Sequence, residues 1–199
     1  MSTMITGGHP SYHSRIPQFV LFSGKEINTA ILGEHPEKFL ASLYRKTHGY
    51  YSYKHSYLAI ENGNTVAGCI FVLDYAIIRK EYFSEVLNHL SHPVLLLRQL
   101  KAMRDAEQII KSVEKDDCYI THLAVLPEFR SMRIGEALLN RAVESCRETN
   151  RRKLLLDVES ENSGAIRFYQ RCGFSELMAR KINIAGMVFS LTRMGKMIE

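Results

Sequence analysis

A short, arginine-containing turn joins an apolar strand to a helix near the middle of this sequence, and this junction constrains the fold most. The strand is predicted over residues 118–126 and the helix from Ile134 onward, with Arg130 and Arg133 in the turn between them. A helix start presents free N–H groups and the positive end of the helix dipole, and two guanidinium groups add charge to the same small volume. We therefore expect a phosphate-bearing cofactor, and in particular a diphosphate, to bind here.

The chain has 199 residues and 46% hydrophobic residues, which suits one globular domain with a core of its own. Residues 1–17 are polar, contain glycine and proline, and lack the apolar stretch of a signal peptide, so a flexible leader is predicted there. Residues 18–199 are predicted to form the single domain. No apolar run approaches the roughly 20 residues that span a bilayer, so no membrane association is expected.

Cysteine spacing and charge distribution indicate which of a metal, an anionic ligand or nucleic acid the chain is expected to bind. The four cysteines lie far apart without metal-ligand spacing, which favours free thiols in a reducing cytoplasm and no bound metal. Residues 129–153 hold seven arginines and lysines against three glutamates, while the whole chain carries a net charge of +5. This basic zone suits an anionic ligand, although residues 147–153 also simply complement a helix C-terminus. No basic-aromatic stripe is present, so nucleic acid is not an expected partner.

Hydrophobic periodicity and turn residues predict the order of the elements. Strands are predicted over residues 18–23, 55–61, 65–75, 118–126, 153–158, 174–182 and 187–194, and helices over 26–33, 36–48, 134–149 and 163–172. Asn62-Gly63 marks a tight hairpin, and residues 77–116 form a helical insertion between the third and fourth strands, with Pro93 in the first turn of a helix. The strand–helix–strand unit over 118–158 predicts a right-handed parallel crossover inside an otherwise antiparallel sheet, an α/β (α+β mixed) fold. Ligands bind at the carboxyl ends of such parallel strands, which is where the arginine-containing turn lies.

Two segments carry a resemblance to a known family. The first is Leu123-Ala124-Val125-x-Pro127-x-x-Arg130-x-x-Arg133-Ile134-Gly135-x-Ala137-Leu138, and the second is Asn162-x-x-Ala165-x-x-Phe168-Tyr169-x-x-x-Gly173-Phe174. In this order, joined by a helix and a strand, they resemble the GNAT superfamily of acetyl-CoA-dependent N-acetyltransferases. The close match covers residues 120–174, whereas residues 1–55 and 77–116 match poorly. The resemblance implies a mostly antiparallel mixed sheet with a central parallel strand pair and flanking helices.

The resemblance also implies where acetyl-CoA (coenzyme A) binds as co-substrate. The main chain of Leu123 and Val125 pairs with the pantetheine arm, and the turn and helix start hold the diphosphate. The implied cofactor-binding residues are Leu123, Ala124, Val125, Arg130, Ser131, Met132, Arg133, Ile134, Gly135, Glu136, Ala137, Asn162 and Tyr169. One departure stands out: Arg133 occupies a position where the family commonly has glycine. Either Arg133 tolerates the glycine conformation and adds a phosphate contact, or it spoils the site.

For catalysis, the resemblance assigns Tyr169 as the group that protonates the departing CoA thiolate. Asn162 either caps the helix that follows or contacts the cofactor. The general base stays open. Strand alternation puts Tyr119, Thr121, Leu123 and Val125 on one face and His122 on the other, which argues against His122. The alternatives are Glu159, Asp157, Asp74, a water held by Thr121, or an amine that arrives neutral and needs no base.

The acceptor is expected to be a primary amine, of a small molecule or of a peptide or protein, contacted by Tyr53, Tyr119 and Thr121. The tyrosine-rich run over 50–57 either lines the acceptor pocket or is an ordinary strand approach. The insertion either covers this site, packs plainly on the sheet, or forms a contact in a homodimer. A non-catalytic acyl-CoA-binding or regulatory domain is the main alternative function. A Rossmann-type nucleotide-binding module is disfavoured by the antiparallel flanks and the lack of a GxGxxG motif.

Overall fold

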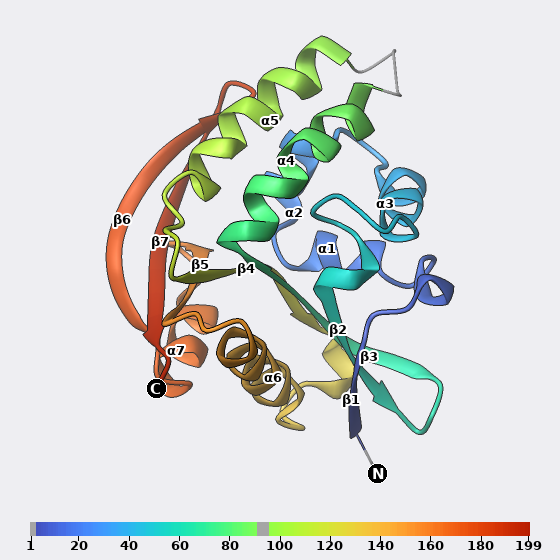
Figure 1. Ribbon diagram of the computed structural model, residues 1–199, viewed down its shortest axis with the longest axis vertical. Helices are drawn as coiled ribbons and strands as arrows, with labels where there is room; N and C mark the ends of the chain where they lie inside the picture. Colours follow the sequence, from blue (N-terminus) through green and yellow to red (C-terminus); the bar gives the residue numbers. More distant parts are fainter. Residues whose placement is uncertain (1–2, 91–95) are drawn as a thin grey trace.

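A seven-stranded sheet in the order β1-β2-β3-β4-β5-β7-β6 forms the centre of the computed structural model, which describes residues 3–90 and 96–199 (Figure 1). The strands are β1 Thr3–Gly7, β2 Ser56–Glu61, β3 Thr65–Asp74, β4 Asp117–Val125, β5 Lys153–Glu159, β6 Ser175–Ile184 and β7 Met187–Met197. The α-helices are α1 Pro17–Phe22, α2 Lys25–Leu32, α3 Glu37–Tyr44, α4 Tyr75–Leu90, α5 Leu96–Ile110, α6 Ile134–Glu148 and α7 Ser163–Arg171. Short 3₁₀ turns are η1 Pro10–Tyr12, η2 Tyr53–His55 and η4 Pro127–Phe129. Among the described residues, no helix is long and apolar enough to cross a membrane.

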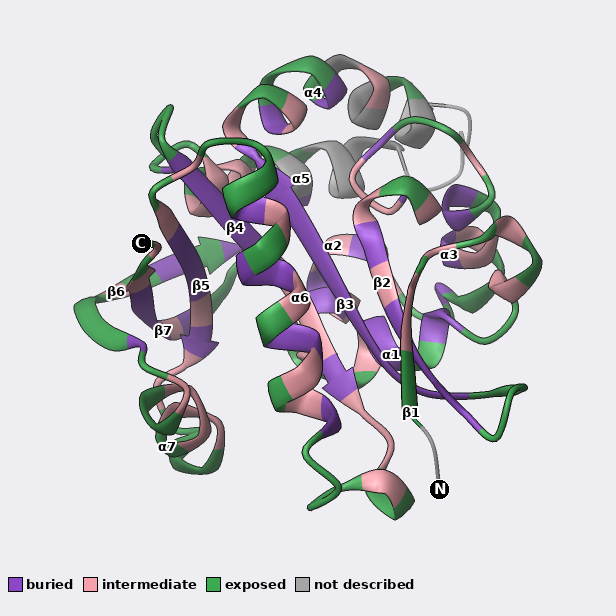
Figure 2. Ribbon diagram, turned by 60° about the horizontal axis from the view of Figure 1, so that its bottom comes forward, coloured by how far each residue is buried: buried purple, intermediate pink, exposed green. Residues whose placement is uncertain are grey.

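The expected mixed sheet is confirmed. Strands β4 and β5 pair in parallel, and every other neighbouring pair in the sheet is antiparallel. The parallel ladder covers only residues 117–120 of β4 and 153–156 of β5. Beyond it the two strands separate, and their arrowheads lie apart in Figure 2. The carboxyl-terminal half of β4 therefore has an edge that β5 does not use.

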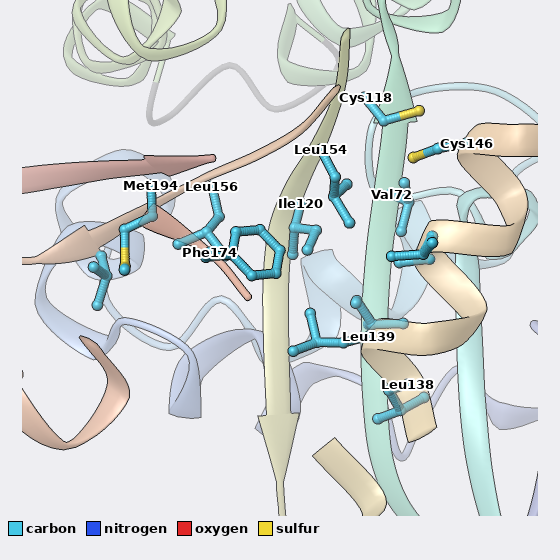
Figure 3. Packing of buried hydrophobic residues seen from close by; sticks show 14 of the residues in the cluster. Val72, Cys118, Ile120, Leu138, Leu139, Cys146, Leu154, Leu156, Phe174 and Met194 are labelled. Carbon is cyan, nitrogen blue, oxygen red and sulfur yellow. The ribbon is translucent and has the colours of Figure 1, made fainter. Parts of the chain in front are cut away.

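Helices cover both faces of this sheet. On one face, α6 packs its apolar stripe against the central strands, with Leu138, Leu139 and Cys146 turned toward Val72 and Ile120 (Figure 3). On the opposite face, helices α1, α2 and α3 enclose a second cluster that includes Phe19, Leu32 and Tyr44. The helical insertion, expected between the third and fourth strands, forms α4 and α5. Pro93, expected at a helix start, lies outside the described residues.

Two expectations for the N-terminal region are corrected. Of residues 18–23, predicted as a strand, residues 18–22 belong to helix α1, and Ser23 is its C-cap. Pro17 opens this helix, and Ile16, Phe19 and Val20 recur at helical spacing on its buried side. Residues 3–7, predicted to lie in a flexible leader, form β1 and pair with β2 from Thr3↔Glu61 to Gly7↔Tyr57. An edge strand is held by main-chain hydrogen bonds, which a polar sequence can make, so hydrophobicity gives no sign of it.

Candidate active site

The turn between β4 and α6 has the shape of an anion cradle. Helix α6 starts without a side-chain cap, and its first main-chain bond runs from Ala137 N–H to the carbonyl of Arg133. The N–H groups of residues 134–136 thus precede the helical hydrogen-bond ladder. In the turn, Ser131 (φ 67°) and Arg133 (φ 58°, ψ 16°) both adopt the left-handed conformation, and both are exposed. These features suit a diphosphate at the helix dipole.

The structure shows whether Arg133 tolerates the backbone conformation expected of a glycine at this position. A left-handed conformation costs a non-glycine residue about 1–2 kcal/mol, yet Arg133 adopts it and helix α6 begins at the next residue. The turn therefore keeps the backbone path that a glycine would give. Its guanidinium and that of Arg130 lie on exposed residues of the same turn.

A cleft of about 680 Å³ opens where β4 and β5 separate. Of the residues predicted for the site, it brings together Leu123, Asn162 and Tyr169 with Tyr119 and Thr121. The remaining walls come from the α1–α2 turn, the loop before η2, helices α4 and α5, and β7; among their residues are Phe22, Ile27, Ile31, Tyr50, Tyr51, Tyr82, Ala106, Ile109 and Leu191. Tyr53, predicted to contact the acceptor, is not among the described residues that line the cleft. Its ring packs in the cluster beneath α3, 6.4 Å from the ring of Tyr44.

Tyr169 on α7 lines the cleft. Its ring packs against Phe168 and Phe174, with centroid distances of 5.3 and 5.7 Å. Burial raises the pKa of the Tyr169 phenol, so it stays protonated at neutral pH. Within the described part of the chain its hydroxyl makes no hydrogen bond. Asn162 caps α7 by accepting from the N–H of Ala165 at 3.0 Å, which is the capping role, and it also borders the cleft.

A β-bulge in β4 overturns the predicted face assignment. His122 pairs with Phe71 and Ile120 with Val72, so Thr121 has no partner on β3. The extra residue breaks the alternation of side chains. Ile120, Leu123 and Val125 consequently pack on the α6 side, whereas Tyr119 and His122 share the opposite face. The prediction that Tyr119 and Thr121 share a face with Leu123 and Val125 is therefore wrong for Tyr119.

His122 lines the cleft. It does so from the face of β4 opposite Leu123 and Val125, the position that had argued against a role as general base. The hydroxyl of Ser23 donates to the carbonyl of Val20 at 2.7 Å and lies 2.9 Å from Nδ1 of His122. Because that hydroxyl proton is committed to Val20, the hydroxyl oxygen accepts from Nδ1–H, which leaves the lone pair on Nε2. Tyr51 stacks on the imidazole and Phe71 meets it edge-on, at 5.6 and 5.8 Å. Burial lowers the pKa of His122 to about 4, so the ring is neutral.

The three candidate carboxylates occupy different settings. Glu159 lines the cleft, and burial raises its pKa, with the nearby charges of Glu26 and Glu161 adding to the shift. Asp157 also lines the cleft, but both of its oxygens are engaged by basic or hydroxyl groups, which makes it a structural acceptor. Asp74 caps α4 through the N–H of Ile77 and pairs with Arg151 at 3.1 Å. It is not among the described cleft residues, so it is not a candidate base.

Arginines that sequence reasoning missed fix the floor of the cleft. Tyr119 donates to Asp157 Oδ2 at 2.9 Å, Arg180 Nη2 binds the same oxygen at 2.9 Å, and Arg193 Nη2 binds it at 2.6 Å. The side chains of Asp157 and Arg193 are each only 4% exposed. Both arginines also donate to the carbonyl of Ile109 at the end of α5. A lone arginine in the apolar run of β7 was the one available signal, since a buried guanidinium needs a counter-charge.

A mixed sheet with a separating parallel pair, an uncapped helix start and a tyrosine in the cleft are the features that the sequence resemblance implied. The family model described as Acetyltransferase (GNAT) family matches residues 25–174. The chain therefore belongs to the GNAT acetyltransferase family.

Similar proteins agree with this assignment. A putative [ribosomal protein bS18]-alanine N-acetyltransferase of Bacillus subtilis is 39% identical over 66 residues, which make up 33% of this chain and 44% of that protein. The chain thus matches less than half the length of this curated relative. A crystal structure described as an acetyltransferase superposes with a TM-score of 0.70 at 21% identity, over 98% of this chain and 100% of the other. PaiA N-acetyltransferase from Thermoplasma acidophilum, solved in complex with coenzyme A, gives 0.56 at 16% identity, over 99% of each chain.

Proposed function

We propose that this protein transfers an acetyl group from acetyl-CoA to a primary amine by direct attack in a ternary complex. The observation that carries the proposal is the position of Tyr169. Tyr169 lines the cleft where β4 and β5 separate, and its hydroxyl has no hydrogen-bond partner among the residues that the structure describes. The anion cradle at residues 131–136 immediately follows β4.

The proposed cofactor site has two parts. The cradle receives the diphosphate through the N–H groups of residues 134–136, with Arg130 and Arg133 adding positive charge. The free edge of β4 beyond Ile120 receives the pantetheine arm through the main chain of Leu123 and Val125, as an added strand would pair. A relative of the same fold solved with coenzyme A supports this choice of co-substrate.

The reaction needs one proton donor and one proton acceptor in the cleft. As the amine nitrogen bonds to the acetyl carbon and the carbon–sulfur bond breaks, Tyr169 donates its proton to the sulfur. The nitrogen gives up a proton to Nε2 of His122 or to Glu159, directly or through water. Exchange with solvent then restores both groups. A main-chain N–H of β4 stabilises the oxyanion.

Replacement of Tyr169 by phenylalanine tests the proposal. In Tyr169→Phe, kcat for thiol release with acetyl-CoA and an amine falls by about 10²-fold, typical of a lost acid, while the dissociation constant of CoA stays within about twofold. Tyr57→Phe, which removes a hydroxyl bonded to Ser145 away from the cleft, is the matched control and keeps its rate. Equal kcat in wild type and Tyr169→Phe removes Tyr169 from the mechanism. CoA binding without turnover over a broad amine panel favours a non-catalytic acyl-CoA-binding domain instead. The proposed setting is the cytoplasm, consistent with four free cysteines.

A further inference from the structure

A chain of buried hydrogen bonds runs from helix α2 to the imidazole of His122. Asn28 on α2 is only 3% exposed, and its Nδ2 donates to the carbonyls of Val20 and Gly24, each at 2.8 Å. The hydroxyl of Ser23 donates to the same Val20 carbonyl at 2.7 Å. Two donors thus fill the acceptor sites of this carbonyl, and together they fix the α1–α2 turn on which Ser23 lies.

These bonds determine how the imidazole of His122 is held. Its Nδ1 lies 2.9 Å from the hydroxyl oxygen of Ser23, whose proton is given to Val20, so Nδ1–H is the donor of that contact. The stacked ring of Tyr51 fixes the plane of the imidazole. Within the described part of the chain no hydrogen bond reaches Nε2, and His122, Ser23 and Asn28 all line the cleft. The lone pair of Nε2 is therefore available to a molecule bound in the cleft.

Glu159, the other candidate base, is not oriented in this way. Its carboxylate makes no hydrogen bond or ion pair with the residues that the structure describes. It lies beside the same turn, because its Oε1 is 3.9 Å from the position of a Cβ added at Gly24. A base acts efficiently when a partner holds it toward the proton that it takes. By this criterion the imidazole of His122 is the better placed of the two.

The position of His122 along β4 also suits a base. The anion cradle follows the carboxyl end of β4, so a pantetheine arm bound along the free edge would run back from the cradle toward Ile120. Its thioester end then lies beside the residues where β4 and β5 separate, and His122 is two positions beyond Ile120. Burial lowers the pKa of His122, so the ring is neutral and its lone pair is free at neutral pH.

We infer that His122 is the catalytic base that takes the amine proton at Nε2, and that Ser23 is the positioning residue that keeps this lone pair free. The inference rests on the proposed acetyl transfer and names its proton acceptor. As the amine nitrogen bonds to the acetyl carbon, it becomes positively charged and acidic, so a neutral imidazole can accept its proton. The carbon–sulfur bond then breaks, the sulfur takes the proton of Tyr169, and the imidazolium releases its proton to water.

Kinetics of the full chain with acetyl-CoA and a panel of primary amines test both roles. We expect kcat to fall about 10²-fold in His122→Gln. In Ser23→Ala it should fall about three- to tenfold, the scale of one lost hydrogen bond. The KM for acetyl-CoA should stay within about twofold in both variants, because neither side chain is placed on the cofactor. Ser23→Thr keeps the hydroxyl and should keep kcat within about twofold of wild type.

Ser42→Ala is the matched control for Ser23→Ala. The hydroxyl of Ser42 donates to the carbonyl of Phe39, three residues earlier, at 2.7 Å, which is the same local bond that Ser23 makes. Ser42 is not among the described residues that line the cleft, so its loss should leave kcat unchanged. Equal kcat in Ser23→Ala and Ser42→Ala overturns the positioning role. A wild-type kcat in His122→Gln, or a larger loss in Glu159→Gln than in His122→Gln, overturns the base assignment while acetyl transfer itself stands.

The tautomer of the His122 ring gives a readout that does not depend on turnover. Long-range proton–nitrogen NMR on protein labelled in its histidine rings reports which ring nitrogen carries the proton, and the loss of signals in His122→Gln assigns this ring. At neutral pH we expect the proton on Nδ1 in wild type and Ser23→Thr, and a shift toward Nε2–H in Ser23→Ala. A proton on Nε2 in the wild type overturns the inference. If the wild type acetylates no amine, the proposed transfer fails and the base assignment with it, and the tautomer alone then upholds or overturns the contact with Ser23.

Discussion

The ring of Phe168 packs directly over Gly135, because a Cβ added at Gly135 would stand only 3.0 Å from Cζ of that ring. Gly135 belongs to the anion cradle, and Phe168 precedes the cleft tyrosine Tyr169 on α7. The two motifs that carry the family resemblance therefore touch each other. Glycine at this position sets how closely α7, and with it the Tyr169 hydroxyl, approaches the start of α6.

Gly135→Ala is expected to impair turnover although alanine is the better helix former. The added methyl group pushes the Phe168 ring by a few tenths of an ångström and shifts Tyr169 with it, and because a displacement near 1 Å costs roughly 10²-fold in rate, the loss should be smaller than that. We expect kcat with acetyl-CoA to fall about three- to tenfold. Gly7→Ala is the control, since a Cβ there meets nothing within 4 Å. A wild-type kcat in Gly135→Ala would show that α7 accommodates the methyl group without disturbing the position of Tyr169.

Two variants of Arg133 separate the effect of its backbone conformation on stability from the effect of its guanidinium on CoA binding. Both Arg133→Gly and Arg133→Ala remove the charge, so both should weaken CoA binding about tenfold, the value of one charge-assisted hydrogen bond. They differ in stability: only Arg133→Ala keeps a side chain at φ 58°, and we expect it to unfold about 1 kcal/mol more easily than Arg133→Gly. Calorimetry with CoA at low and high salt, with urea titrations, measures both quantities. Wild-type affinity in both variants would mean that the guanidinium makes no contact.

Much of this site was predictable from sequence because its chemistry is local. The turn with Arg130 and Arg133, the helix start at Ile134 and the parallel crossover depend on residues close together in the chain, and the structure has them as expected. The bulge at Thr121 was not predictable, because register depends on which residues of β3 face β4. Because of this one extra residue, Tyr119 lies on the face of the sheet opposite the one predicted for it.

Other features depend on partners distant in sequence. Strand β1 exists because β2 offers it an edge; apart from Ile5, which packs partly buried against the core, its side chains are polar or exposed. The tie between Asp157 and Arg193 joins residues on neighbouring strands and also holds the end of α5. Composition and spacing do not encode such pairings. Only the lone arginine in an apolar strand hints that a counter-charge lies opposite.

His122 should make the protein sensitive to acid. Burial lowers its pKa from 6.5 to about 4, so the folded protein keeps the ring neutral where the unfolded chain already binds a proton. The stability linked to this ring is fully present above pH 6.5 and is lost as pH falls toward 4, by about 3 kcal/mol in total. Urea titrations from pH 7 to 4 should show this slope in wild type and a shallower one in His122→Gln. His48→Gln, at an exposed histidine, should keep the wild-type slope. An unchanged slope in His122→Gln would mean that the ring titrates normally.

Asp157→Asn should destabilise the fold more than the loss of any one of its hydrogen bonds. Asparagine still accepts from Tyr119, but it leaves Arg193 (4% exposed) and Arg180 (15% exposed) without their counter-charge. Breaking a buried ion pair from one side costs about 3–5 kcal/mol, whereas Tyr119→Phe removes one hydrogen bond to a charged group, about 1.5–3 kcal/mol. Urea denaturation of the two variants gives the comparison. Hydrogen exchange at residues 108–112 should rise in Asp157→Asn, because the arginines that hold the end of α5 lose their anchor. A smaller loss in Asp157→Asn than in Tyr119→Phe would mean that the two guanidinium groups find other partners, and that helix α5 is held by its apolar contacts alone.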